Sequence, residues 1–444
     1  MAETASQASA PITHKRVLNI AIPIVISNAT VPILGAVDTG VVGQLGEAAP
    51  IGAVGIGAII LTAIYWVFGF LRMGTTGLTS QAHGAGQTGE VAAMLTRAMM
   101  IGLTAGVAII MLQIPLFYGS FLISPASAEV ESLARDYMAI RVWSAPAVIA
   151  LYGVTGWLIA QERTRAVLAL QVVMNGINII LDLWFVLGLG WGVEGVAFAT
   201  FIAEWAGFAL GLWLCRDVLK SPAWKDWPRV FDRARLRLMM AVNRDILLRS
   251  LMLQAIFVSF LFIAGDFGDT ELAANQVLMQ FLHITAYALD GFAFAAEALV
   301  GQAMGQRNRA DLRRSALLSS LWGVIITTGL TLSFALFGGA IIDLMTTSEE
   351  VRRAARVYLI YMILAPVAGI AAWMLDGIFI GATRAQDMRN MMAVSLIIYI
   401  ITALLLVPEY GNHGLWIALL ISFVARGITL GMRYPTLEAQ ATEA

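Results

Sequence analysis

Residues 51–70 read IGAVGIGAIILTAIYWVFGF, a stretch without a single charged side chain. A transmembrane helix needs about 20 consecutive apolar residues, so this stretch is long enough to cross a bilayer. The composition agrees, because 59% of the 444 residues are hydrophobic, only 13% carry a charge, and the mean hydropathy is +0.79. Soluble domains average about 25% charged residues. We therefore expect a polytopic membrane protein.

Apolar runs of this kind recur along the whole chain, which predicts an all-α membrane protein with twelve transmembrane helices. Two runs, 51–79 and 271–303, exceed one bilayer thickness, so their helices should tilt or project from the membrane. The predicted spans are 17–41, 51–79, 93–117, 136–160, 166–189, 193–215, 246–265, 271–303, 315–342, 354–381, 390–408 and 413–434.

Lysine and arginine residues gather in alternate loops, above all in the central segment 216–245. Because such residues favour the cytoplasmic side, both termini are expected in the cytoplasm, with residues 1–13 as a short disordered tail. The exceptions, among them Arg135 and Arg141, lie where predicted helices begin. The chain is thus expected in the cytoplasmic (inner) membrane. Loops without Lys or Arg lie around 43–50, 188–195, 265–271 and 408–413.

The sequence repeats itself with an offset of about 221 residues. Residues 81–84 (QAHG) recur as 302–305 (QAMG), and residues 156–159 (GWLI) recur as 377–380 (GIFI). An offset of six helices preserves membrane orientation, which is typical of transporters whose two halves are related by an axis along the membrane normal. Duplication also occurs in channels, so the repeat alone does not establish transport. We predict an N-lobe over 1–215, a cytoplasmic linker over 216–245 and a C-lobe over 246–444.

Ionisable side chains inside membrane spans are costly and are candidates for function. Three arginines lie toward the cytoplasmic ends of their spans, and for these we expect a structural role in which the long side chain reaches the membrane surface. For Glu204 an ion pair within its own lobe is an equal alternative. The ionisable residues in the predicted spans are Asp38, Arg72, Asp182, Glu204, Arg249, Asp290, Glu297, Asp376 and Arg426.

One polar stripe stands out on the fifth predicted helix. Asn175, Asn178 and Asp182 share a face of that helix, and Thr200 on the next helix can join them. Asp38 lies in the outer part of the first helix. Burial disfavours the charged form of a carboxyl group, so these aspartates can bind and release a proton. The alternative is a permanently protonated aspartate that bonds across helices.

The first helix also contains Pro23, which removes a backbone hydrogen bond and marks a kink. A helix with a proton-binding carboxyl group beyond this proline can bend when the proton binds. A static kink is an equal alternative.

The second half of the chain carries a different set of acids. Asp290 and Glu297 lie seven residues apart and therefore share a helix face. They can form a second cation site with Asp376, or pair with Arg249 as a structural element. Because the mid-membrane charges are mainly acidic, the sequence favours cations or protons over an anionic pyrophosphate head group.

Motifs typical of soluble nucleotide-binding proteins and metalloenzymes are missing from the sequence. It has no Walker loop, no GxGxxG and no HExxH, and its four histidines are isolated. Its single cysteine, Cys215, excludes a disulfide framework. A net charge of −1 gives no basic surface for nucleic acid. We expect no enzyme, no metal site and no cofactor, so an ion gradient has to supply the energy.

Four segments resemble signatures of the multidrug and toxic compound extrusion (MATE) family, and together they are similar to its DinF-like subfamily. The resemblance extends from about residue 14 to 434. The segments are 31–39 (VPILGAVDT), 71–78 (LRMGTTGL), 286–293 (AYALDGFA) and 375–384 (LDGIFIGATR).

The resemblance implies two six-helix lobes that form a V around a central cavity, and export of amphipathic, often cationic, compounds by proton or sodium antiport. It implies that Asp38 is the proton site, that Asn178, Asp182 and Thr200 belong to its polar network, and that the first helix bends at Pro23.

One departure from the family pattern concerns the sodium site of the NorM-type branch. That branch has an acid on the seventh helix where this chain has Gln254. Asp376 retains the acid of the tenth helix. The absence of the other acid thus weakens the case for sodium coupling but does not exclude it. We expect a monomeric, proton-coupled exporter whose partners are an amphipathic small molecule and the lipid bilayer. The alternatives are a sodium-coupled exporter and a flippase for a lipid-linked precursor.

Overall fold

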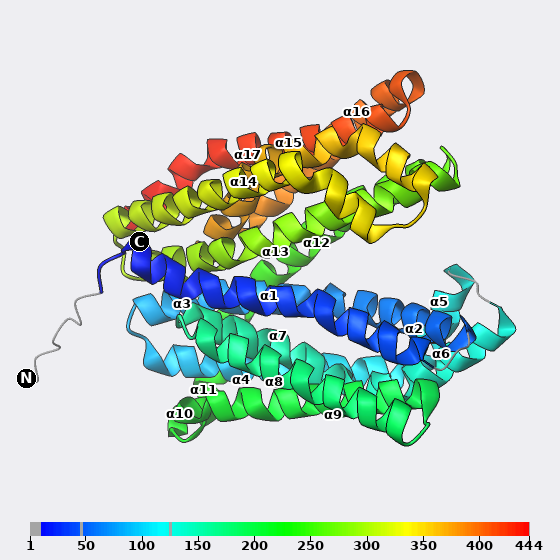
Figure 1. Cartoon of the computed structure of the whole chain (residues 1–444). Helices are drawn as coiled ribbons and strands as arrows, with labels where there is room; N and C mark the ends of the chain where they lie inside the picture. Colours follow the sequence, from blue (N-terminus) through cyan, green and yellow to red (C-terminus); the bar gives the residue numbers. More distant parts are fainter. Residues whose placement is uncertain (1–9, 45–47, 124–126, 444) are drawn as a thin grey trace, which may run out of the picture.

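The computed structural model describes residues 10–44, 48–123 and 127–443, and this part of the chain forms helices without strands (Figure 1). Within these ranges twelve helices are long and apolar enough to cross a membrane, as the sequence predicts. Most of the predicted N-terminal tail, residues 1–9, lies outside the described residues. The helices form two bundles that lie side by side.

The N-terminal bundle, drawn in blue to green in the lower half of Figure 1, packs around a core of aliphatic and aromatic side chains. Its elements are α1 (His14–Gly43), α2 (Ala48–Trp66), η1 (Val67–Gly69), α3 (Phe70–Gly84), α4 (Thr88–Met111), α5 (Gln113–Ile123), α6 (Ala128–Arg141), η2 (Val142–Ser144), α7 (Ala145–Ala160), α8 (Thr164–Asp182), η3 (Leu183–Gly188) and α9 (Gly192–Leu214).

The C-terminal bundle, drawn in green to red in the upper half of Figure 1, has its own core. Its elements are α12 (Arg233–Gly265), α13 (Asp269–Gly305), α14 (Arg309–Met345), α15 (Glu349–Gly381), α16 (Ala385–Tyr410) and α17 (Asn412–Glu443). With 37 residues at about 1.5 Å each, α13 is roughly 55 Å long, well beyond a bilayer core of about 30 Å.

Large apolar side chains cover the outer faces of both bundles. Leu344 is 89% exposed and Ile114 is 79% exposed, which would be unfavourable in water. In a bilayer these side chains meet lipid, while the helices satisfy their own backbone hydrogen bonds. The outer surface thus fits a multi-pass membrane protein.

The repeat found in the sequence reappears in the secondary structure. Three pairs of helices begin at positions 221 residues apart: α4 and α14, α6 and α15, and α8 and α16. The backbone repeats in the turns as well, because Glu162 and Thr383 are equivalent and both adopt a positive φ, of 61° and 55°. The two bundles are therefore copies of one structural unit.

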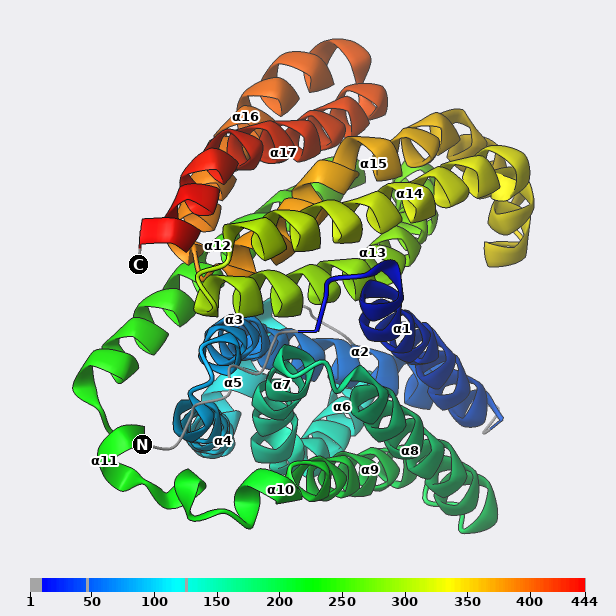
Figure 2. The ribbon, with the colours of Figure 1, turned by 90° about the vertical axis from the view of Figure 1, so that its left-hand side faces the viewer.

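The connection between the bundles is shorter than the predicted linker 216–245, because α12 is already helical from Arg233. It consists of α10 (Arg216–Leu219), η4 (Pro222–Lys225) and α11 (Trp227–Val230), and runs along the edge of the molecule (Figure 2). It is anchored by Arg97 of α4, whose Nε donates to the carbonyl oxygen of Val230 at 2.8 Å.

The two bundles touch mainly through α1 and α3 on one side and α13 and α15 on the other. The chains approach closely at Gly84 and Gly305, where an added β-carbon would overlap the carbonyl oxygens of Gln302 and Gln81 respectively. Arg16 adds a link, because it donates to Glu162 at 2.6 Å and to the side chain of Gln302 at 2.9 Å. These contacts lie toward the end of the molecule where α1 begins, and the bundles diverge toward the other end (Figure 1).

Candidate functional site

The first candidate site lies in the N-terminal bundle, where two aspartates face each other. Asp38 of α1 and Asp182 of α8 lie within hydrogen-bonding reach of each other, and Asp182 is fully buried. An ionised carboxylate can only accept hydrogen bonds, so two carboxyl groups in contact need a proton between them. The geometry thus creates a place for one proton.

The polar stripe of α8 faces α1, as its spacing suggests. Nδ2 of Asn178 donates to Asp182 at 2.5 Å, and Nδ2 of Asn175 donates to the hydroxyl of Thr30 on α1 at 2.9 Å. All three stripe residues are buried. The stripe therefore holds one carboxyl oxygen of Asp182 and ties α8 to α1.

Thr200 lies in α9, which packs against α8, and is buried. Its hydroxyl donates to the carbonyl oxygen of Val196 in the preceding turn at 3.0 Å. Among the described residues it makes no hydrogen bond to either aspartate, so it does not hold a carboxyl oxygen of the pair.

A buried ion pair lies next to the two aspartates; an ion pair of Glu204 within its own lobe was one of the two alternatives from the sequence, but its partner was not predicted. Arg141 binds Glu204 of α9, and it also donates to the hydroxyl of Tyr137 at 3.0 Å. Arg141 lies near enough to interact electrostatically with Asp38 and Asp182. The expectation that Arg141 marks the start of a helix is wrong, since one continuous span runs over Ala128–Ala160. The position of Arg141 inside the predicted span 136–160 was the sequence signal that could have indicated a buried arginine in need of an acidic partner.

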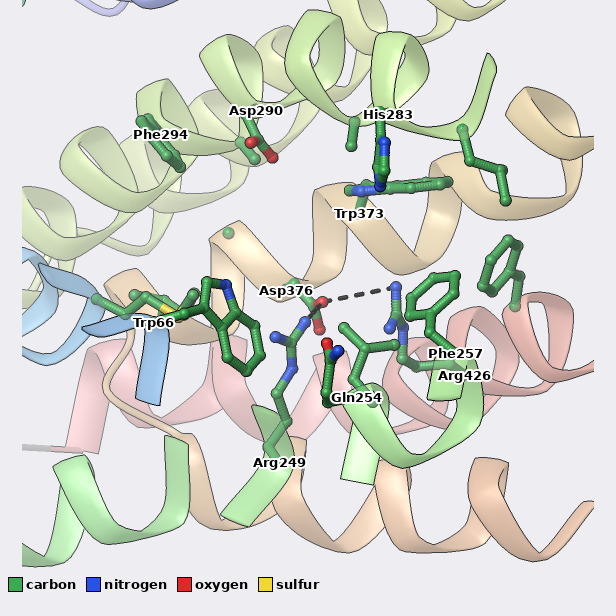
Figure 3. A pocket seen from close by; sticks show the side chains of 18 of the residues that line it. Trp66, Arg249, Gln254, Phe257, His283, Asp290, Phe294, Trp373, Asp376 and Arg426 are labelled. Carbon is green, nitrogen blue, oxygen red and sulfur yellow. Dashed lines mark hydrogen bonds and ion pairs between the residues drawn. The ribbon is translucent and has the colours of Figure 1, made fainter. Parts of the chain in front are cut away.

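The second candidate site is a cavity of about 600 Å³ on the inner side of the C-terminal bundle (Figure 3). Its wall includes the rings of Trp66, Phe257, Phe294 and Trp373. Ligand pockets of roughly 300–1,000 Å³ with apolar walls and a few polar groups are typical of small-molecule sites. The cavity therefore has the size and lining for an amphipathic molecule.

The charges of this cavity form a partly closed network. Arg72 donates to Glu297 at 2.9 Å, which joins α3 to α13. Asp376 of α15 binds Arg249 of α12, and the Asp376 carboxylate lies 3.7 Å from the Arg426 guanidinium. The expectation that these three arginines reach the membrane surface is wrong, because acids on facing helices hold them inside.

The remaining predicted residues, Asp290 and Gln254, also line the cavity. Asp290 shares a wall with Glu297, as their spacing indicates, but among the described residues it has no ion pair within 4 Å. No three His, Cys, Asp or Glu side chains of the described ranges gather closely enough to hold a metal ion. The charges on this cavity wall are balanced between three arginines and three acids, so the expected excess of acids is not found in the C-lobe.

Two six-helix bundles of one unit, with buried charges at the inner faces, define a membrane transporter of duplicated architecture. The MatE family model matches residues 23–184 and 246–405, so the chain belongs to the MatE (MATE) family of transporters.

Similar proteins agree with this family. The chain is 40% identical to DNA damage-inducible protein F of Escherichia coli over 427 residues, which are 94% of this chain and 91% of that protein. It is 24% identical to a probable multidrug resistance protein NorM of Xanthomonas campestris over 94% of this chain and 92% of that protein. These relatives and the fold are those of transporters and not of enzymes.

A solved structure matches over almost the whole chain. The Vibrio cholerae MATE transporter VcmN in its bent form superposes with a TM-score of 0.86, 20% identity and coverage of 97% of this chain and 98% of that one. The predicted two-lobe fold with twelve transmembrane helices is thus confirmed.

Proposed function

We propose that this protein is a proton-coupled antiporter that exports amphipathic, often cationic, compounds across the cytoplasmic membrane. The contact between Asp38 and Asp182 carries the proposal. A proton on this pair allows both carboxyl groups to be buried together, and its loss leaves two negative charges that repel each other. A cationic substrate stabilises that second state, so substrate and proton compete.

Helix α1 is suited to couple this exchange to movement because it contacts both lobes. Its first half, with Ile20 and Ala21, is buried in a cluster with Phe292 of α13. Its second half bonds to α8 through Thr30. Pro23 lies between these contacts, inside a helix that is continuous over its whole length.

Because a transition needs an interaction that differs between two states, protonation supplies the driving force for moving α1. Loss of the proton releases the second half of α1 from α8 while the first half stays on the C-lobe. The helix then changes its bend near Pro23, where the backbone hydrogen bond is missing.

The charge distribution of the loops supports cytoplasmic termini and an inner-membrane location. The bundles touch at the end where α1 begins, so with this orientation the interior opens away from the cytoplasm. Arg72, Arg249 and Arg426 hold two of the three C-lobe acids, which favours protons over sodium as the coupling ion. We propose that the protein works as a monomer.

The test is export of a fluorescent cationic dye from proteoliposomes under separately imposed proton and sodium gradients. We expect export with the proton gradient and its loss in Asp38→Asn. Asp266→Asn, an exposed aspartate after α12, is the matched control and should export at the wild-type rate. Export by folded Asp38→Asn at the wild-type rate, or export with sodium alone, would overturn the proposal.

A further inference from the structure

We propose that the C-lobe cavity binds the acidic group of an amphipathic substrate between Arg249 and Arg426. The inference rests on the proposed export function and adds a substrate class to it. It starts from an excess of positive charge around Asp376, one carboxylate that serves two guanidinium groups.

The cluster of Arg249, Asp376 and Arg426 carries a formal charge of +1 and is almost completely buried. The side chains of the two arginines are 8% and 5% exposed. Buried charges are normally paired, because removing an ion from water without a partner is costly. The other acid and base of this wall, Glu297 and Arg72, neutralise each other.

Hydrogen-bond donors of the cluster are left over as well. The Nε atoms of Arg249 and Arg426 are buried and lack a partner among the described residues, and so does the second oxygen of Asp376. Both arginines line the cavity and extend toward Asp376 from different helices (Figure 3). A guanidinium group is a strong donor to carboxylates, so two of them with free N–H groups form a site for an anion.

Apart from Asp376 and Glu297, Asp290 is the only acid on the cavity wall among the described residues. It lies on α13, on the wall opposite Arg249 in Figure 3, and has no ion pair within 4 Å in the described ranges. Asp290 is therefore not in contact with Arg249 or Arg426 and does not neutralise their guanidinium groups. An acid in the cavity would supply the missing contact.

The walls around the two arginines are suited to an apolar body. Phe257 lies beside Arg426 in Figure 3 and packs against the ring of Phe423, and Trp373 lies on the helix that carries Asp376. A volume of about 600 Å³ accommodates a drug-sized molecule. The ligand class is thus an apolar or aromatic body with a carboxylate at one end.

The test compares three probes that share one body and differ in the head group. Pyrenebutyrate, pyrenebutanol and pyrenebutyl-trimethylammonium are titrated into the purified full chain in neutral maltoside detergent, and binding is followed by fluorescence anisotropy. We expect wild-type protein to bind the acid at least tenfold tighter than the alcohol. Arg249→Gln and Arg426→Gln should each reduce this preference at least fivefold and leave binding of the alcohol unchanged.

Two variants make the result specific. Asp376→Asn removes the internal competitor for both guanidinium groups, so the acid should bind at least fivefold tighter, which a purely structural role of Asp376 would not produce. Arg356→Gln removes an arginine that pairs with Asp343 outside the cavity, and it should keep the wild-type preference.

Equal binding of acid and alcohol by wild-type protein would overturn the inference. So would an unchanged preference in both folded arginine variants, or weaker acid binding in Asp376→Asn. A phosphatidic acid with a pyrene label distinguishes a lipid head group, and a preference for this lipid alone would also overturn it. The assay uses no ion gradient, so its outcome is independent of proton-coupled export, and failure of either proposal can be recognised separately.

Discussion

Gln81 and Gln302 occupy equivalent positions in the two halves, and each donates a hydrogen bond into the opposite lobe. Nε2 of Gln81 donates to the carbonyl oxygen of Gly381 at 3.1 Å, and Nε2 of Gln302 donates to that of Ala160 at 3.1 Å. The two acceptors are themselves 221 residues apart. The closed end of the molecule is thus held by a pair of bonds related by the pseudo-two-fold axis.

Gln81→Leu and Gln302→Leu should each favour opening of this end. Each loses a hydrogen bond between lobes, worth about 0.5–1.5 kcal/mol, so the open population should rise roughly two- to tenfold. Hydrogen exchange of the backbone over residues 81–88 and 302–309 measures the change. Gln113→Leu is the control, because that side chain bonds to Ile110 within its own lobe. Unchanged exchange in both variants would show that the two bonds do not hold the lobes together.

The sequence predicts the architecture well because its signals are local and periodic. Apolar runs indicate the twelve helices, and the recurrence of residues 81–84 at 302–305 indicates the duplication. These two repeated motifs lie where the lobes are in close contact, because Gly84 and Gly305 permit the backbones to approach. That role could not be predicted, since it depends on which lobe surfaces meet.

The candidate site was predicted less completely, for a physical reason. The stripe of α8 follows from helical spacing, and so does the shared face of Asp290 and Glu297. Ion pairs between helices that are distant in the sequence leave no regular residue spacing by which they could be recognised. The partners of Arg141 and Arg249 depend on which helices face each other in the folded protein, so the sequence did not identify Glu204 as the partner of Arg141 or Asp376 as the partner of Arg249.

Asp182→Asn should abolish most of the proton exchange that accompanies substrate binding. The amide that replaces the carboxyl group can donate to Asp38 permanently, so the pair needs no shared proton. We expect proton release on addition of a saturating cationic substrate in weakly buffered detergent solution to fall at least fivefold, as in Asp38→Asn. Asp266→Asn should release protons like the wild type. Wild-type release from Asp182→Asn would mean that Asp38 titrates without its neighbour.

The buried pair of Arg141 and Glu204 should matter more for stability than a half-buried one. Glu204→Gln leaves the guanidinium group of Arg141 without a counter-charge, and breaking a buried pair costs about 3–5 kcal/mol. The half-buried i,i+4 pair of Arg135 and Glu131 is the control, and Glu131→Gln should cost at most about 1 kcal/mol. Thermal unfolding in detergent compares the two. Equal melting temperatures would contradict the buried character of the first pair.

Arg97 should keep the connection between the lobes folded against α4. Beside its bond to Val230, it donates to the carbonyl oxygen of Arg229 at 2.5 Å and to Glu90 at 2.6 Å. Hydrogen bonds that involve a charged group contribute about 1.5–3 kcal/mol each. In Arg97→Gln the segment 216–232 should therefore detach, and trypsin should cleave it at least tenfold faster.

The trypsin sites of this segment, Arg216, Lys220, Lys225 and Arg229, are present in both proteins, so the rates compare the folding of the segment directly. Arg135→Gln removes a half-buried arginine outside the connection and should leave the rate unchanged. Arg97→Gln also leaves Glu90 buried without its partner, and the double variant Glu90→Gln/Arg97→Gln removes that charge. If cleavage stays at the wild-type rate in the double variant, the carbonyl contacts of Arg97 do not anchor the segment; if it rises tenfold there as well, they do.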